Sequence, residues 1–178
     1  IKVIYIQRSK GYDARPAFTI AQMEEAISKI REKNKSVYIV VDNCYGEFTE
    51  YKEPTEVGAD VAIGSLIKNP GAGITPTGGY IAGSKKAIDL IAGRFTTPTT
   101  GMEIGSYTNG YRAFFQGIFH APNATYNALY GAILFAAAFA KLGYEVCPMP
   151  DAVRADIPQA INFHNERELI AFVQSIQK

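Results

Sequence analysis

Two short runs of almost wholly apolar residues, at positions 37–41 and 61–66, constrain the fold of this chain most strongly. A strand with one face in water alternates apolar and polar residues, whereas these runs are apolar nearly throughout, as in strands covered on both faces. A third run, at 2–7, is β-branched and aromatic, and residues 19–33 between it and the next run have helical spacing with Thr19 as a plausible N-cap. The order strand, helix, strand predicts an α/β fold with a mainly parallel sheet and flanking helices.

The second half of the chain predicts further elements. Residues 79–83 are typical of a short strand, and residues 84–93 of a helix. Pro122 suits the first turn of an Ala-rich helix that we expect to end at Leu142, before Gly143. Its most apolar part, at 128–140, is shorter than the roughly 20 residues that span a bilayer, so we interpret it as a buried helix.

The last segments are too small to bury a core by themselves. An extended stretch at 144–147, a strand at 157–163 and an amphipathic helix at 166–176 are predicted there. We therefore expect two parts. Residues 1–120 form a partial large domain, and residues 121–178 form a linking helix and the start of a small C-terminal α+β domain.

Charge and cysteine content exclude several classes of partner. Lys and Arg total 18 against 17 for Asp and Glu, which gives no excess charge for nucleic acid or an anionic membrane, so we expect small-molecule ligands. Cys44 and Cys147 are far apart and have no Cys or His at ligand spacing, so neither a disulfide framework nor a metal site is indicated. The first residues resemble a strand rather than a secretory signal, and we expect a cytoplasmic protein.

Three polar side chains that could bind a ligand lie at, or just beyond, the ends of two predicted strands. Asp42 comes directly after the apolar run 38–41, and Lys68 lies just beyond the run that ends near Leu66. Open α/β sheets bind ligands at the carboxyl ends of their strands, so both groups can face one cavity. A lysine there must lose its proton to attack an aldehyde, which desolvation can promote. Ser65 can present its hydroxyl group to a phosphate.

These residues lie in motifs that carry a resemblance. Residues 41–48, 64–71 and 77–83 read Val-Asp-Asn-Cys-Tyr-Gly-Glu-Phe, Gly-Ser-Leu-Ile-Lys-Asn-Pro-Gly and Thr-Gly-Gly-Tyr-Ile-Ala-Gly. They resemble the methionine gamma-lyase and aluminium-resistance protein family, a fold-type-I pyridoxal-phosphate family related to cystathionine beta- and gamma-lyases. The resemblance extends over nearly the whole chain, including the segments at 7–12, 100–105 and 115–122.

The resemblance implies roles for the three side chains. It makes Lys68 the catalytic lysine that binds pyridoxal 5′-phosphate as a Schiff base, Asp42 the partner of the pyridine nitrogen and Ser65 a phosphate contact. It also implies a carbon–sulfur lyase that acts on a sulfur-containing amino acid, as methionine gamma-lyase or cystathionine beta-lyase does. The family further implies a homodimer or homotetramer, in which the Thr-rich loop at 96–101 approaches the site of a neighbouring subunit.

The resemblance also implies that parts of the site lie outside this chain. Family members are longer, with a phosphate-binding helix and a stacking aromatic residue upstream of Ile1. Their substrate-carboxylate arginine would lie beyond Lys178. We therefore expect a segment of a longer polypeptide, with weak cofactor binding when isolated.

Other motifs in the chain are incomplete. The spacing of Ser65 and Lys68 also fits the nucleophile motif of penicillin-binding enzymes, but neither Ser-Asp-Asn nor Lys-Thr-Gly occurs. Gly71 and Gly73 begin like a dinucleotide-binding fingerprint, yet Pro76 stands at the third glycine. Two alternatives stay open, namely an aminotransferase-like enzyme and a non-catalytic, cofactor-binding stress protein.

Other polar residues are weaker candidates for a site. Cys44 is interpreted as a small packed residue rather than a reactive thiol. We interpret both histidines, His120 and His164, as structural. The remaining weak site candidates are Tyr45, Arg94 and Arg112.

Overall fold

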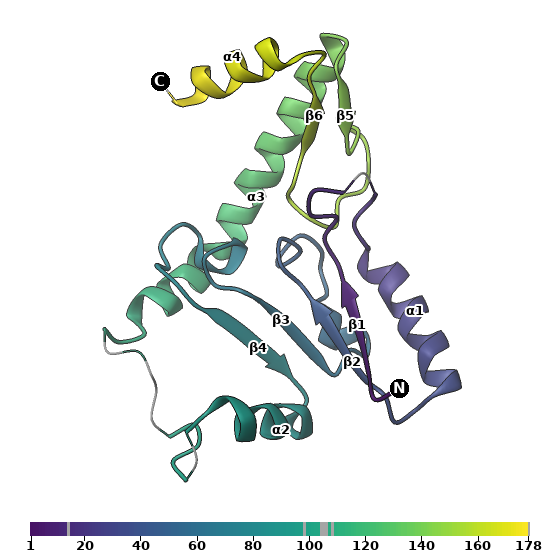
Figure 1. Cartoon of the computed structure of the whole chain (residues 1–178), viewed down its shortest axis with the longest axis vertical. Helices are drawn as coiled ribbons and strands as arrows, with labels where there is room; N and C mark the ends of the chain where they lie inside the picture. The colour runs from purple at the N-terminus through teal and green to yellow at the C-terminus, as the bar shows by residue number, and fades with distance from the viewer. Residues whose placement is uncertain (14, 98, 104–106, 108, 178) are drawn as a thin grey trace.

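The computed structural model describes residues 1–13, 15–97, 99–103, 107 and 109–177 (Figure 1). Pro98 of the Thr-rich loop, and Ile104 and Gly105 of the motif at 100–105, lie outside the described residues. The elements are β1 Val3–Gln7, α1 Ile20–Lys33, β2 Tyr38–Asp42, η1 Pro54–Val57, β3 Val61–Ser65, η2 Asn69–Gly71, β4 Gly79–Gly83, α2 Lys85–Phe95, α3 Arg112–Lys141, β5 Glu145–Cys147, β6 Ala160–Asn162 and α4 Glu166–Gln177.

A four-stranded sheet in the order β1-β2-β3-β4 forms the centre of the fold. Strands β1, β2 and β3 are parallel, which confirms the expected mixed α/β architecture with a mostly parallel sheet. Strand β4 runs antiparallel to β3, which the sequence pattern did not predict. The connection between them contains only the short turn η2 and no crossover helix, so the chain returns alongside β3 in the opposite direction.

Helix α1 covers one face of this sheet. Thr19 caps it through a capping box with Gln22, as the sequence predicted for the N-cap. Its buried side chains, which include Met23 and Ile27, form the core together with Ile39, Val41 and their neighbours. The other face of β1 is open, since Val3 and Tyr5 are both more than half exposed. The second face of β1 is therefore uncovered, because none of the described elements packs against it.

Helix α3 differs from its prediction in both start and burial. It begins at Arg112, with Pro122 inside the helix rather than at its first turn. The part of α3 before Pro122 packs against η2, where a Cβ atom on Gly117 would lie only 2.8 Å from the Gly71 carbonyl oxygen. The expected domain boundary after residue 120 falls within this continuous helix.

The burial of α3 was also wrongly predicted. Among the described residues of the segment at 128–140 only Ala136 is buried, while large side chains such as Tyr130 and Leu134 are exposed. An apolar composition alone does not reveal how much of a helix surface other elements cover. None of the described helices combines the length and the apolar character needed to cross a membrane.

A second, smaller unit stands over the carboxyl ends of β1 and β2 (Figure 1). Strands β5 and β6 pair antiparallel, and the predicted strand at 157–163 is reduced to Ala160–Asn162. An aromatic cluster joins these strands to α3 and α4, with members Phe139, Tyr144, Phe163 and Phe172. Asp156 ties this unit to the first sheet by accepting hydrogen bonds from Ser9 Oγ at 2.7 Å and from the Lys10 backbone at 3.0 Å.

Candidate active site

The parallel strands bring Asp42 and Lys68 to the same edge of the sheet. Asp42 is the last residue of β2, and Lys68 follows the end of β3 after a short turn. The charge of Lys68 is close enough to lower the pKa of Asp42. The structure therefore places the two chemically active side chains at neighbouring strand ends, as the sequence pattern predicted for their positions.

Asp42 is held as a carboxylate by several donors. Tyr5 Oη donates to one carboxylate oxygen at 2.8 Å, and the Cys44 backbone N–H donates to the other at 3.0 Å. Partial burial acts to raise the pKa of Asp42, but the hydrogen bonds from Cys44 and Tyr5 and the charge of Lys68 outweigh it, so the pKa is lowered. In return, burial and the neighbouring Asp42 raise the pKa of Tyr5 to about 12.

Lys68 is half-buried and lies over an aromatic ring. Its Nζ is 4.0 Å from the centroid of the Tyr45 ring, a cation–π arrangement. Burial acts to lower the pKa of Lys68, but Cys44 and Tyr45 outweigh it and raise the pKa. Burial alone thus does not lower the pKa of Lys68, because the side chain is only partly buried and lies close to polar groups. The sequence prediction also invoked a bound cofactor, and it stays a prediction.

Ser65 ends β3 beside this pair. Its Oγ accepts a weak hydrogen bond from the Ile67 backbone N–H at 3.4 Å, across the turn that leads to Lys68. No described residue accepts the hydroxyl proton, so Ser65 can donate to an anionic oxygen. Its position fits the predicted phosphate contact, and that role stays a prediction.

Tyr45 is a stronger candidate than the sequence indicated. Its φ is 68°, a left-handed conformation that is strained for a large side chain and that is often found at functional sites. Tyr5 was missed altogether. It contacts Asp42 from the adjacent strand, and only the register that pairs Gln7 with Asp42 reveals it.

The remaining weak candidates lie elsewhere or have packing roles. Arg94 and Arg112 are exposed, at the end of α2 and the start of α3. Cys44 is a free, half-buried thiol whose pKa burial raises, consistent with a packed residue. His164 contacts Glu168 and stacks on Tyr144, a structural role, whereas His120 is exposed beside Phe119.

A buried polar network supports the loop that follows Asp42, and no sequence pattern indicated this network. Arg8 is fully buried and donates to Asn43 at 2.7 Å and to Glu50 at 2.8 Å. Tyr80 Oη donates to Glu47 at 2.9 Å, and Asn69 donates to the Glu47 carbonyl at 2.9 Å. The loop after Asp42 is thereby tied to the turn that carries Lys68.

Glu47 gives this network a pH dependence. Burial raises the pKa of Glu47 from 4.5 to about 7. The folded protein therefore binds more protons than the unfolded chain between these values, and the contribution of Glu47 to stability, present below about pH 4.5, is lost as pH rises through about 7. This shift corresponds to about 3 kcal/mol. We expect Glu47→Gln to flatten the fall in free energy of unfolding between pH 5 and 7, measured by denaturant titration.

The matched control is Glu32→Gln, which changes an exposed carboxyl group on α1. It should leave the pH profile unchanged. A Glu47→Gln profile that follows that of the parent protein would contradict the assignment.

Comparison with known proteins identifies the family. The family model described as methionine gamma-lyase matches residues 1–178, the whole chain. The chain belongs to the methionine gamma-lyase family. Curated proteins are also similar to this chain. The uncharacterised protein YnbB of Bacillus subtilis (strain 168) is 46% identical over 99% of this chain and 42% of its own length.

Solved structures agree with this family assignment. A protein of Listeria monocytogenes, provisionally named a cystathionine beta-lyase involved in aluminium resistance, is 49% identical with a TM-score of 0.96, over 99% of this chain and 44% of that one. A carbon-sulfur lyase involved in aluminium resistance from Clostridium novyi NT is 44% identical with a TM-score of 0.94, over 99% and 42% of the two chains.

More distant structures extend the likeness of fold. The methionine gamma lyase CalE6 of Micromonospora echinospora is 15% identical with a TM-score of 0.54, and an aspartate aminotransferase of Thermus thermophilus is 15% identical with a TM-score of 0.64. These two likenesses concern the fold alone. The chain spans between 42% and 58% of the length of the curated relatives that it matches.

Proposed function

We propose that this protein is a pyridoxal-phosphate-dependent carbon–sulfur lyase that acts on a sulfur-containing amino acid. The observation that carries the proposal is the placement of Asp42, whose pKa is lowered, and Lys68 at neighbouring strand ends, in a member of the methionine gamma-lyase family. The name of the similar protein from Clostridium novyi NT supports the reaction class.

The chemistry of the three side chains fits this cofactor. A carboxylate with a lowered pKa suits a protonated pyridine nitrogen, and Asp42 has one. An amine suits the aldehyde, and Lys68 supplies it. A hydroxyl group with an uncommitted proton suits a phosphate oxygen, and Ser65 has one. Lys68 would therefore attach the cofactor, with Asp42 and Ser65 holding its two polar ends.

When bound, the cofactor supplies an electron sink for cleavage of bonds at the substrate α-carbon. Asp42 would hold the pyridine nitrogen of the cofactor, and Tyr5 and the Cys44 N–H stabilise its carboxylate. The Lys68 amine would hold the cofactor aldehyde, and the same group would accept and return the substrate proton as a general base and acid. Tyr45 orients the Lys68 amine through its ring.

The proposal is tested by product analysis with the full-length protein. Cystathionine and methionine are supplied separately, and thiol and keto acid are measured. We expect the two products in equal amounts from at least one substrate. Keto acid without thiol would indicate an aminotransferase-like reaction instead. Bound cofactor with neither product would favour a non-catalytic stress protein.

A further inference from the structure

A cavity of about 510 Å³ lies beside the candidate active site. It opens between the loop after β1 and the segment that leads into β6, and its lining includes Lys10, Asp13, Tyr45 and Gln159. The volume is in the usual range for small-molecule sites. The same Tyr45 ring that lines this cavity lies 4.0 Å from Lys68 Nζ, so the cavity is separated from the catalytic amine by one aromatic side chain.

Lys10 is a buried cation that forms no ion pair with any residue that the structure describes. The residue is 3% exposed, and Nζ donates to the Cys147 carbonyl oxygen at 2.8 Å. No carboxylate oxygen lies within 4.0 Å of Nζ anywhere in residues 1–13, 15–97, 99–103, 107 and 109–177. An ammonium group has three donors, and burying it without a counter-charge is costly. A carboxylate in the cavity would supply that counter-charge.

A second cation adds to the positive potential on this side of the cavity. Arg154 is 9% exposed and donates from Nη2 to Gln159 at 2.6 Å, while its Nε and Nη1 have no hydrogen-bond partner among the described residues. Asp156 offsets part of this charge, although it is already engaged by Ser9 and by the Lys10 backbone. Asp13 also lines the cavity, so the charge there is mixed and suits a zwitterion.

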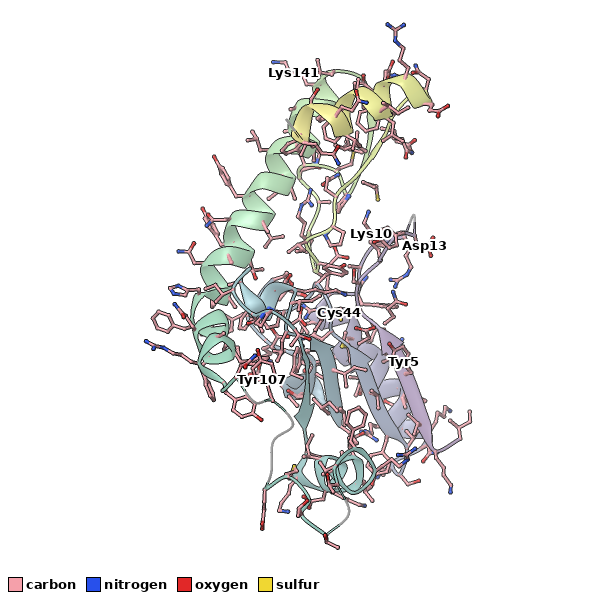
Figure 2. The ribbon with its side chains drawn as sticks, turned by 60° about the vertical axis from the view of Figure 1, so that its left-hand side comes forward. Tyr5, Lys10, Asp13, Cys44, Tyr107 and Lys141 are labelled. Carbon is pink, nitrogen blue, oxygen red and sulfur yellow. The ribbon has the colours of Figure 1, made fainter. Side chains whose placement is uncertain are left out.

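The strand order separates Lys10 from Ser65, the predicted phosphate contact. Ser65 ends β3 and Lys10 follows β1, while β2, which ends in Asp42, lies between them. Neighbouring strands are about 4.8 Å apart, which places the two strand ends roughly 10 Å apart. The anion that Lys10 would bind is therefore not the phosphate at Ser65. Figure 2 shows Lys10 and Asp13 together, above Cys44 and toward the second unit.

We propose that Lys10 binds a carboxylate group of the amino-acid substrate in this cavity. The inference rests on the proposed function, since that function supplies the amino acid. Lys10 lies on the loop after β1, whereas the family resemblance places the carboxylate-binding arginine beyond Lys178. Lys10 holds the substrate by its charge, and Tyr45, which lines the same cavity, contacts the Lys68 amine through its ring.

The test compares methionine with 3-(methylthio)propylamine, which is methionine without its carboxylate. Calorimetric titration of the full-length protein gives both dissociation constants. We expect the parent protein to prefer methionine at least tenfold. Lys10→Gln, which keeps a donor for the Cys147 carbonyl, should lose most of this preference, and Lys10→Arg should retain it. Lys2→Gln, at an exposed lysine, is the control.

The ratio of the two constants separates ligand binding from a structural role. If Lys10 merely ties the loop to β5, Lys10→Gln will weaken both ligands equally or neither, and the proposal is overturned. The absence of any preference for methionine in the parent protein overturns it as well. The visible absorption of the cofactor is recorded in the same samples. Its absence from the parent protein would count against the proposed function, while the ratio still decides the role of Lys10.

Discussion

Lys68→Ala should abolish covalent attachment of the cofactor and lower lyase turnover by at least about 1,000-fold. Lys68 supplies both the amine for attachment and the group that moves the substrate proton, and proton transfer by a positioned side chain alone contributes about 100- to 10,000-fold. The visible absorption spectrum measures attachment, and the rate of thiol release measures turnover.

Stability should change little in the same variant. The substitution removes the cation–π contact with Tyr45, which at a half-buried position is worth about 1 kcal/mol. Lys52→Ala, at an exposed lysine in the loop before η1, is the matched control and should behave as the parent protein does. Turnover of Lys68→Ala at the parent rate would remove Lys68 from the mechanism.

Asp42→Ala should damage turnover far more than it damages cofactor retention. The contacts of Lys68 and Ser65 remain in this variant, whereas the charge beside the pyridine nitrogen is lost. Removal of one partner of a buried ion pair typically costs about 3–5 kcal/mol, and a loss of this size in transition-state stabilisation corresponds to roughly 100-fold or more in rate. Cofactor content, measured after gel filtration, should fall by less than about threefold.

Asp42→Asn tests whether turnover depends on the charge of this side chain or on its shape. Asparagine can still accept hydrogen bonds from Tyr5 and the Cys44 N–H through its amide oxygen. We expect it to retain the cofactor as well as the parent protein does and to be nearly as slow as Asp42→Ala. Asp89→Asn, on exposed α2, is the control. Unimpaired turnover in Asp42→Ala would refute the role of the carboxylate.

The sequence predicted those parts of the fold that depend on local pattern. Unbroken apolar runs identified β2 and β3, and Thr19 identified the start of α1, because hydrophobic periodicity and capping act over a few residues. The direction of β4 depends instead on its connection to β3. The signal from Pro122 did not locate the start of α3, which begins earlier, at Arg112, and packs Gly117 against Gly71.

The residues of the candidate site also differ in whether a local sequence pattern reveals them. Asp42 and Lys68 could be located from sequence because each stands just beyond an apolar run. Tyr5 could not, since its contact with Asp42 requires the register of β1 on β2. The network around Glu47 could not be located from the sequence either. Gly64 leaves the space for it, because a Cβ atom there would lie 2.5 Å from the ring of Tyr80.

Borohydride reduction of the full-length protein with pyridoxal phosphate, followed by peptide mapping, tests the central assignment most directly. Reduction makes the link between cofactor and lysine permanent, so the labelled residue is identified without reference to activity. We predict a phosphopyridoxyl group on Lys68, and its loss in Lys68→Ala. A label on another lysine, with Lys68 unmodified, would contradict the account.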